Sequence, residues 1–169
     1  GDIMHFLEEL SHIFDIVAGE REIDFIVNLE DTEEEVWFSP SKLERILYNL
    51  LSNAFKYTQP GGYVKLSAKL IKEEKGTFVQ ISVKDNGRGI PKEAQEQIFE
   101  SYYQVEKRDH REGFGLGLSL TRSLIHMHKG EIRVESEVNK GSDFIVTLNV
   151  SENAYNPDER SSENITTEE

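Results

Sequence analysis

Hydrophobic side chains recur at three- and four-residue steps in the first part of the chain, a spacing typical of an amphipathic helix. This pattern predicts a helix over 3–18 that ends near Gly19. Apolar and polar residues then alternate in DFIVNLED, which predicts a strand over 24–31. The segment EVWFSP predicts a short second strand over 35–40.

A second amphipathic helix is expected over about 40–57. Ser39 is a suitable N-cap, and Pro40 is well tolerated at the first helical position. At about 100° per residue, the apolar side chains of this segment fall on one face, which is predicted to face the core. They are Leu43, Ile46, Leu47, Leu50, Leu51 and Ala54.

The rest of the chain predicts further strands and short helices. Two strands joined around Gly76 are expected over 63–74 and 77–85, followed by helices over 92–104 and 116–129. A closing hairpin is expected over 131–138 and 142–150. Strands follow one another without an intervening helix too often for an all-parallel sheet. The predicted fold is therefore α+β, a two-layer α/β sandwich whose mixed, mostly antiparallel sheet is covered on one face by about three helices.

Composition agrees with a single soluble domain. The chain has 169 residues and 37% hydrophobic content, and it contains neither an apolar run long enough to span a bilayer nor a signal-peptide pattern. It has no cysteine, which excludes disulfides and thiolate metal sites and fits a reducing compartment. The cytoplasm is the expected location.

The net charge of −13 is unevenly distributed. Residues 1–35 carry twelve acidic side chains and one basic one, and residues 151–169 carry six and one, so 36–150 has a net charge of +3. A mildly basic body is compatible with a bound triphosphate, but it is too weakly charged to indicate nucleic-acid binding.

Asn49, Asn53 and Lys56 form a second stripe beside the apolar face of the helix expected over 40–57. Amide oxygens are hard, neutral ligands of the kind that Mg²⁺ accepts. Asparagine is also an ordinary surface hydrogen-bonding residue and a middling helix former. Taken alone, the stripe fits a metal site and a solvated helix edge equally well.

Two further segments combine a turn with candidate chemistry. DNGRGI, 85–90, fits a simple turn, yet Asp85 in a pocket would accept a hydrogen bond from the exocyclic amine of adenine and reject guanine. GFGLGLSL, 113–120, fits a flexible hinge or a backbone that approaches phosphates at a helix N-terminus. Its spacing matches neither the dinucleotide fingerprint nor a P-loop.

In this order, these segments resemble the ATP-binding catalytic domain of bacterial sensor histidine kinases, in the superfamily shared with gyrase, the mismatch-repair ATPase and the ninety-kilodalton heat-shock chaperone. The similar segments are LERILYNLLSNAFKYT, the family's asparagine-bearing helix; DNGRGI and GFGLGLSL, its two glycine boxes; IFESYYQV, its phenylalanine box; and KGSDFIVTL, its closing strand. The resemblance implies a Bergerat-type ATP-binding domain over 20–150. Residues 1–19 would be a linker helix from an absent dimerisation and phosphoacceptor domain, and 151–169 an acidic linker or tail.

The resemblance implies a role for each matching residue. Asn53 would coordinate the Mg²⁺ ion of Mg-ATP, with Asn49 in support, and Lys56 and Tyr57 would contact phosphate or ribose. Asp85 would bind the adenine amine. The remaining residues implied in ATP binding are Gly87, Gly89, Ile90, Phe99, Arg108, Gly113, Gly115, Leu116 and Gly117.

The resemblance also implies a mobile lid over about 101–114, anchored by Phe99. The basic side chains Lys107, Arg108 and Arg111 within it are candidates for the γ-phosphate, and each also fits an ordinary solvated charge. Asp143 departs from the family pattern, which usually has threonine there, and it is expected to alter the water structure near adenine.

Position 49 separates two classes of reaction. Related ATP hydrolases place a glutamate there as the general base for water, whereas an asparagine amide cannot accept the proton. The sequence thus favours transfer of the γ-phosphoryl group to a supplied nucleophile, and the resemblance implies that this nucleophile is a histidine. The alternatives are an ATP-binding regulatory module, a protein-serine kinase of the anti-sigma-factor type and a gyrase-like ATP hydrolase.

The expected acceptor lies on a separate domain, because no histidine of this chain has the family's phosphoacceptor context. The five histidines are His5, His12, His110, His126 and His128. The expected partners are the protein's own dimerisation and histidine phosphotransfer domain and a downstream response-regulator receiver domain. Neither nucleic-acid binding nor direct membrane contact is expected of this segment, although its parent protein could be anchored in the inner membrane.

Overall fold

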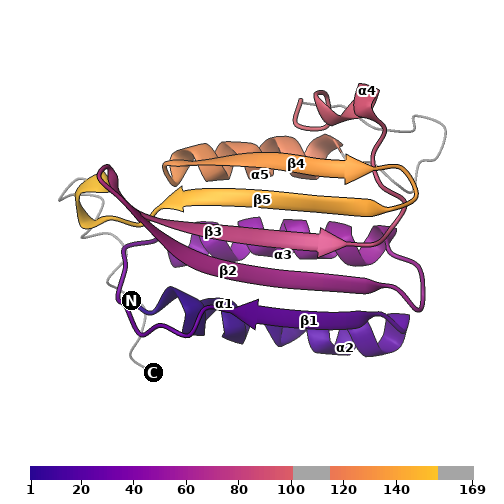
Figure 1. Cartoon of the computed structure of the whole chain (residues 1–169), viewed down its shortest axis with the longest axis horizontal. Coiled ribbons are helices and arrows are strands. Elements are labelled where there is room, and N and C mark those ends of the chain that lie inside the picture. Colours follow the sequence, from indigo (N-terminus) through magenta and orange to yellow (C-terminus); the bar gives the residue numbers. More distant parts are fainter. Residues whose placement is uncertain (101–114, 156–169) are drawn as a thin grey trace.

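The computed structural model describes residues 1–100 and 115–155. Five strands form one sheet in the order β1-β2-β3-β5-β4, and helices lie along one of its faces (Figure 1). The strands are β1 (Asp24–Leu29), β2 (Tyr63–Glu73), β3 (Gly76–Asp85), β4 (Gly130–Glu137) and β5 (Gly141–Asn149). The helices are α1 (Ile3–Ser11), α2 (Ile13–Arg21), α3 (Pro40–Tyr57), α4 (Lys92–Gln95), α5 (Gly115–Met127) and a 3-10 turn, η1 (Glu152–Ala154).

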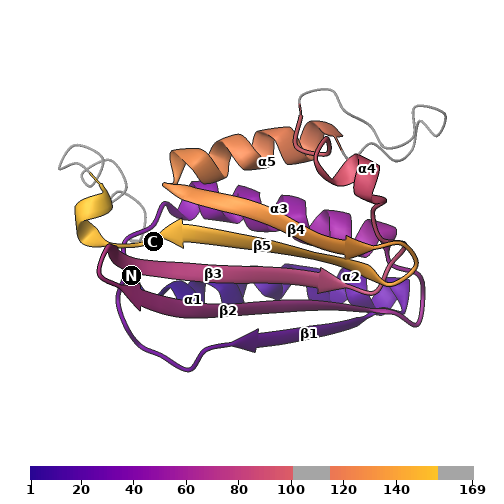
Figure 2. The ribbon, with the colours of Figure 1, turned by 45° about the horizontal axis from the view of Figure 1, so that its top comes forward.

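The sheet is mixed, with a single parallel pair at one edge. β1 runs parallel to β2, and the pairs β2–β3, β3–β5 and β5–β4 are antiparallel. The two views in Figures 1 and 2 place α1, α2, α3 and α5 on the same side of this sheet. The predicted two-layer α+β sandwich is therefore confirmed.

The core lies between the helices and the sheet. Alternate strand residues such as Leu66, Ile81 and Val146 are fully buried against the helices. The apolar face predicted for α3 is buried along its whole length, from Leu43 to Ala54. Ser39 caps α3 by accepting a hydrogen bond from the backbone N–H of Lys42, as its position before Pro40 predicts.

The N-terminal helix differs from the prediction. The pattern predicts one helix over 3–18, whereas the chain forms two helices separated at His12, and the second continues to Arg21. Glu22 then takes the left-handed conformation, with φ of 56°, and its N–H bonds the last carbonyls of α2. The helix therefore ends two residues beyond Gly19, because the cap is formed by Glu22 and not by the glycine.

The strand predicted over 35–40 is wrong. In this segment only Glu35 forms an isolated bridge, to Asp2. The next two backbone N–H groups bond carbonyls at different places: Val36 donates to Gly1, and Trp37 donates to Val150. The segment thus bonds both the first residue of the chain and the residue after β5, and within the described part it forms no ladder with another strand.

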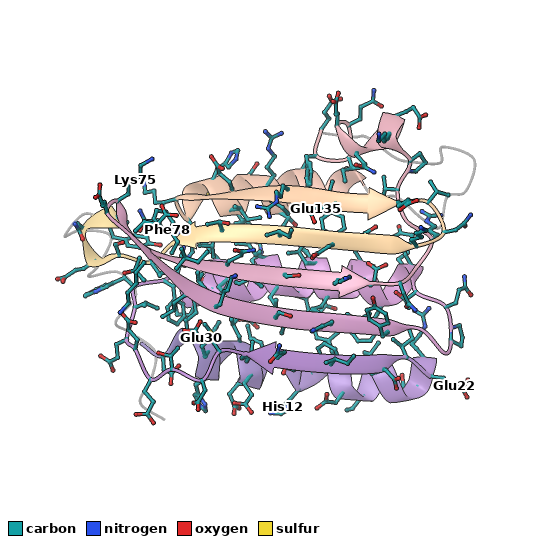
Figure 3. All side chains as sticks on the ribbon, in the orientation of Figure 1. His12, Glu22, Glu30, Lys75, Phe78 and Glu135 are labelled. Carbon is teal, nitrogen blue, oxygen red and sulfur yellow. The ribbon has the colours of Figure 1, made fainter. Side chains whose placement is uncertain are left out.

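The opposite face of the sheet carries many charged side chains. Glu135 of β4 lies there, and His12, Glu22 and Glu30 lie along the β1 edge of the molecule (Figure 3).

No helix among the described residues is both long and apolar enough to cross a membrane.

Candidate functional site

The amides of α3 lie at the border between its buried and exposed faces. Asn49 and Asn53 are half-buried and Lys56 is exposed, whereas Leu50 and Ala54, which follow the two amides, are buried. The helical spacing places all three polar side chains on one edge of α3. This edge faces α5, since the Asn49 Nδ2 donates a hydrogen bond of 3.1 Å to the Thr121 hydroxyl of that helix.

A small hollow lies at the C-terminal end of α3, where β3 ends and β5 begins. We call it the α3 hollow. It is lined by Asn53, Ala54, Tyr57, Asp85, Arg88, Gly89, Ser142 and Phe144.

Asp85 is the one acidic side chain among the residues that line the α3 hollow, and it is only 6% exposed. Burial raises the pKa of its carboxyl group to about 6, while hydrogen bonds from the backbone N–H groups of Gly87 and Ser142 oppose this rise and the nearby charge of Asp143 adds to it. The bond from Gly87 to the Asp85 Oδ1 is 2.9 Å long. At neutral pH the carboxylate is still mostly ionised, so the hollow contains a buried hydrogen-bond acceptor.

Glycines bring backbone close to this carboxylate. A Cβ at Gly87 would overlap the Tyr57 carbonyl oxygen and lie 3.0 Å from the Asp85 Oδ1. Gly89 has a φ of +71°, and a Cβ there would overlap the Glu137 carbonyl. The turn after β3 can take its observed path only without side chains at these two positions.

A wider cleft lies between α1 and β1, but its lining disfavours an anionic ligand. Six carboxylate residues surround it, together with His5 and His12. The carboxylates are Asp2, Glu8, Asp15, Glu30, Asp31 and Glu33. Their combined negative field would repel a phosphate, so the α3 hollow is the better candidate for a nucleotide.

Comparison with known proteins places this geometry in a family. The model of the histidine kinase-, DNA gyrase B- and HSP90-like ATPase family matches residues 38–152. The chain belongs to this ATPase family. The match includes the whole of α3, the turn after β3 and β5, which together form the α3 hollow.

Individual relatives are sensor kinases. The adaptive-response sensory kinase SasA of Synechococcus sp. (strain JA-2-3B'a(2-13)) is 39% identical over 134 residues, which are 79% of this chain and 34% of that kinase. The sensor histidine kinase WalK of Bacillus subtilis (strain 168) is 36% identical over 148 residues, 86% of this chain and 24% of WalK. The chain thus spans about a third or less of the length of these two relatives.

Solved structures agree with the sequence relatives. The nucleotide-free catalytic domain of histidine kinase ThkA superposes with a TM-score of 0.75 at 25% identity, over 89% of this chain and 94% of that one. Full-length ShkA in complex with AMPPNP gives a TM-score of 0.77 at 28% identity, over 89% of this chain and 30% of ShkA. The predicted similarity to the catalytic domain of sensor histidine kinases is confirmed.

Other predicted members of the ATPase site lie in or around the α3 hollow. The Tyr57 ring lines it, with the Lys56 ammonium 5.4 Å from its centroid. Ile90 is buried, and its N–H donates to the Ser136 hydroxyl. Phe99 packs edge-on against Phe144 of the hollow, with 6.4 Å between ring centroids.

The second glycine motif is only partly described. α5 begins at Gly115, so Gly115, Leu116 and Gly117 form its first turn. Lys107, Arg108, Arg111 and Gly113, as well as most of the predicted lid, lie outside the described residues.

Asp143, which was expected to alter the water structure near adenine, points away from the α3 hollow. Its carboxylate accepts a hydrogen bond of 2.5 Å from the Ser82 hydroxyl on the face of the sheet away from the helices, whereas its neighbours Ser142 and Phe144 line the α3 hollow. Side chains alternate between the faces of a strand, so a residue between two hollow-facing ones must point away. The charge of Asp143 still reaches the site, since it adds to the rise in the pKa of Asp85 that burial mainly causes.

Four residues that line the hollow were not among the predicted site residues: Ala54, Arg88, Ser142 and Phe144. Ser142 could have been found from the alternation in β5. Arg88 lies in the turn after β3, and its guanidinium is 4.5 Å from the centroid of the Tyr57 ring. Such stacking of a cation on an aromatic face depends on the fold that brings the turn to α3, and no local pattern signals it.

Proposed function

We propose that this chain binds Mg-ATP in the α3 hollow and transfers the γ-phosphoryl group to a histidine on a separate dimerisation domain. The observation that carries the proposal is that the buried Asp85 carboxylate and the Asn53 amide line the same hollow. These side chains offer an acceptor for a base and a neutral oxygen for a metal ion at one site. The sensor kinases among the relatives support the transfer reaction.

Asp85 would select adenine. An ionised carboxylate only accepts hydrogen bonds, so it pairs with the exocyclic amine of adenine and faces the carbonyl oxygen of guanine unfavourably. Its pKa of about 6 leaves it mainly ionised above pH 7. Burial excludes competing water and makes the contact more discriminating than it would be at the surface.

Asn53 would hold the Mg²⁺ ion, with Asn49 in support. The described residues contain no group of three or more acidic or histidine side chains that could hold a metal ion. Mg²⁺ is often bound through few protein oxygens together with phosphates and water, so one or two amide oxygens suit it. The ion would neutralise phosphate charge during transfer, and the exposed Lys56, one turn away on α3, could contact a phosphate directly.

Asn49 favours transfer over hydrolysis. Its amide cannot take a proton from water, and its nitrogen is engaged by Thr121. Slow ATP hydrolysis is therefore expected. A gyrase-like turnover of ATP by the isolated chain would contradict this assignment.

The histidines of the described part do not suggest an acceptor. His128 is fully buried, and His5, His12 and His126 lie outside the α3 hollow. We therefore place the acceptor, and a response-regulator receiver domain that takes the phosphoryl group from it, on other domains or proteins in the cytoplasm. With γ-labelled ATP, no label is expected on the chain alone, and label is expected on a histidine-bearing dimerisation domain added in trans.

Calorimetric titration of ATP, with Mg²⁺ and with EDTA, tests the proposal. Asn53→Ala should abolish most of the gain in affinity that Mg²⁺ provides in the wild type. Asn28→Ala, a matched change at an exposed position of β1, should leave that gain intact. An unchanged gain in Asn53→Ala would exclude Asn53 as the metal ligand, and GTP binding as tight as ATP would exclude Asp85 as the adenine acceptor.

A further inference from the structure

Asn49 is held from the neighbouring helix. Its Nδ2 lies 3.1 Å from the Oγ1 of Thr121, and the two residues are 72 positions apart in the sequence. Thr121 belongs to α5, which packs beside α3 on the same face of the sheet (Figures 1 and 2). Thr121 is fully buried, so water cannot easily replace its hydroxyl as the partner of the amide.

The direction of this bond determines which end of the Asn49 amide is available. The nitrogen of an amide only donates hydrogen bonds and the oxygen only accepts them. With the nitrogen turned toward Thr121, the planar amide directs its oxygen away from α5. Without the hydroxyl, the amide could rotate and present its nitrogen, which repels a cation.

We propose that Thr121 is a positioning residue that holds the Asn49 amide with its oxygen available to the Mg²⁺ ion that Asn53 binds. This inference rests on the proposed Mg-ATP function. It also connects two motifs, because Thr121 lies six residues after Gly115, where α5 begins.

Thr121→Val tests the proposal, because valine keeps the shape of threonine and removes only the hydroxyl. ATP affinity is measured by calorimetry with Mg²⁺ and with EDTA. We expect the Mg²⁺-dependent gain in affinity to fall about five- to tenfold, while the affinity in EDTA stays within twofold of the wild type. Thr121→Ser, which keeps the hydroxyl, should restore most of the gain.

A structural role alone gives a different result. Loss of packing would lower the affinities with Mg²⁺ and with EDTA together, or lower the melting temperature and leave both affinities unchanged. Thr147→Val on β5, a half-buried residue outside the α3 hollow, provides the matched control. All titrations are made well below the melting temperature of the least stable variant.

A double-mutant cycle isolates the pair. In an Asn49→Ala background, Thr121→Val should produce no further loss of the Mg²⁺-dependent gain. If Thr121→Val retains the full gain of the wild type, or if its effect persists without Asn49, the positioning role is excluded while Mg-ATP binding stands. If the wild type itself shows no Mg²⁺-dependent affinity for ATP, the proposed function fails first.

Discussion

Helix α3 has a buried polar group at each end, and the two groups are satisfied differently. At its N-terminal end, the fully buried His128 accepts a hydrogen bond of 2.8 Å at Nε2 from the backbone N–H of Ser39. The His128 Nδ1 lies 2.8 Å from the hydroxyl of Tyr155, and that hydroxyl also bonds the Asn149 carbonyl. These contacts assign a neutral ring with its proton on Nδ1.

At the other end, Asp85 is buried as a charged group. It accepts hydrogen bonds from backbone N–H groups, yet burial still raises its pKa to about 6, and its side chain lines the α3 hollow. His128 is neutral and has protein partners on both ring nitrogens. Asp85 is ionised at neutral pH, although its burial disfavours the charged form. A buried polar side chain therefore indicates a ligand site when the fold leaves part of its charge uncompensated, and it indicates a structural link when the fold satisfies it.

The largest expected effect is the loss of stability in His128→Ala. The substitution leaves the buried N–H of Ser39 without its partner and creates a cavity, so the free energy of unfolding should fall by about 3 kcal/mol. Urea denaturation followed by circular dichroism measures this change. His126→Ala, two positions earlier and exposed, should change it by less than about 0.5 kcal/mol.

ATP affinity should be unaltered in His128→Ala at temperatures where the variant is folded. A loss of ATP affinity without a loss of stability would contradict a purely structural role for His128.

Asp85→Asn should have effects of opposite sign on stability and binding. An acid whose pKa is raised in the folded state destabilises the fold when it ionises, and a shift from 3.8 to about 6 corresponds to roughly 3 kcal/mol. Above pH 7 the variant should thus be about 2–3 kcal/mol more stable than the wild type, since asparagine can still accept the bond from Gly87. Its ATP affinity should fall tenfold or more, because the amide loses charge and can present a donor to the base.

The pH dependence provides the control for this prediction. The folded state binds the extra proton between pH 3.8 and 6, so the wild type gains stability relative to Asp85→Asn as pH falls through this window. The difference between the two proteins should be largest above pH 6 and nearly absent below pH 4. A difference that is constant with pH would mean that the carboxyl group is not the cause.

Gly89→Ala should combine moderate losses of stability and affinity. Alanine is strained at a φ of +71°, and its Cβ would overlap the Glu137 carbonyl, so we expect a loss of about 1–2 kcal/mol. The turn that forms one wall of the α3 hollow would shift, and ATP affinity should fall several-fold.

Gly19→Ala is the matched control for this change. It lies in α2 with no atom within 4 Å of the added Cβ, and it should raise stability by up to about 1 kcal/mol. Equal losses at both glycines would contradict a role for the specific path of the turn after β3.

The difference between the two ends of α3 could be predicted only in part from the sequence. Helical periodicity placed Asn49 and Asn53 beside the core face of α3, because that information is local. The partner of Asn49 on α5 and the contacts of His128 depend on which helices and loops pack together, and no local pattern contains this. His128 could be described from the sequence only as a residue near a helix end.

The alternation of apolar and polar residues in β5 predicts which side chains face the helices. Phe144, Val146 and Leu148 of β5 are buried toward the helices, so the same alternation places Asp143 on the other face and Ser142 at the hollow. The expectation for Asp143 rested on the family pattern at that position and did not consider which face of β5 the side chain occupies. The strand predicted over 35–40 was wrong for another reason. A short apolar pattern does not show whether a neighbouring strand is available to pair with it.

Tyr155→Phe is the smallest and most specific change. It removes the hydroxyl that contacts the His128 Nδ1 and the Asn149 carbonyl, while the edge-on contact of the two rings, 5.8 Å between centroids, can remain. Because Tyr155 is half-buried and water can partly replace the hydroxyl, the free energy of unfolding should fall by only about 1 kcal/mol, with ATP affinity unchanged. In a His128→Ala background the same substitution should have less effect, since its main partner is gone. An equal loss in both backgrounds would show that the Tyr155 hydroxyl stabilises the domain through Asn149, and the histidine would then be linked to α3 through Ser39 alone.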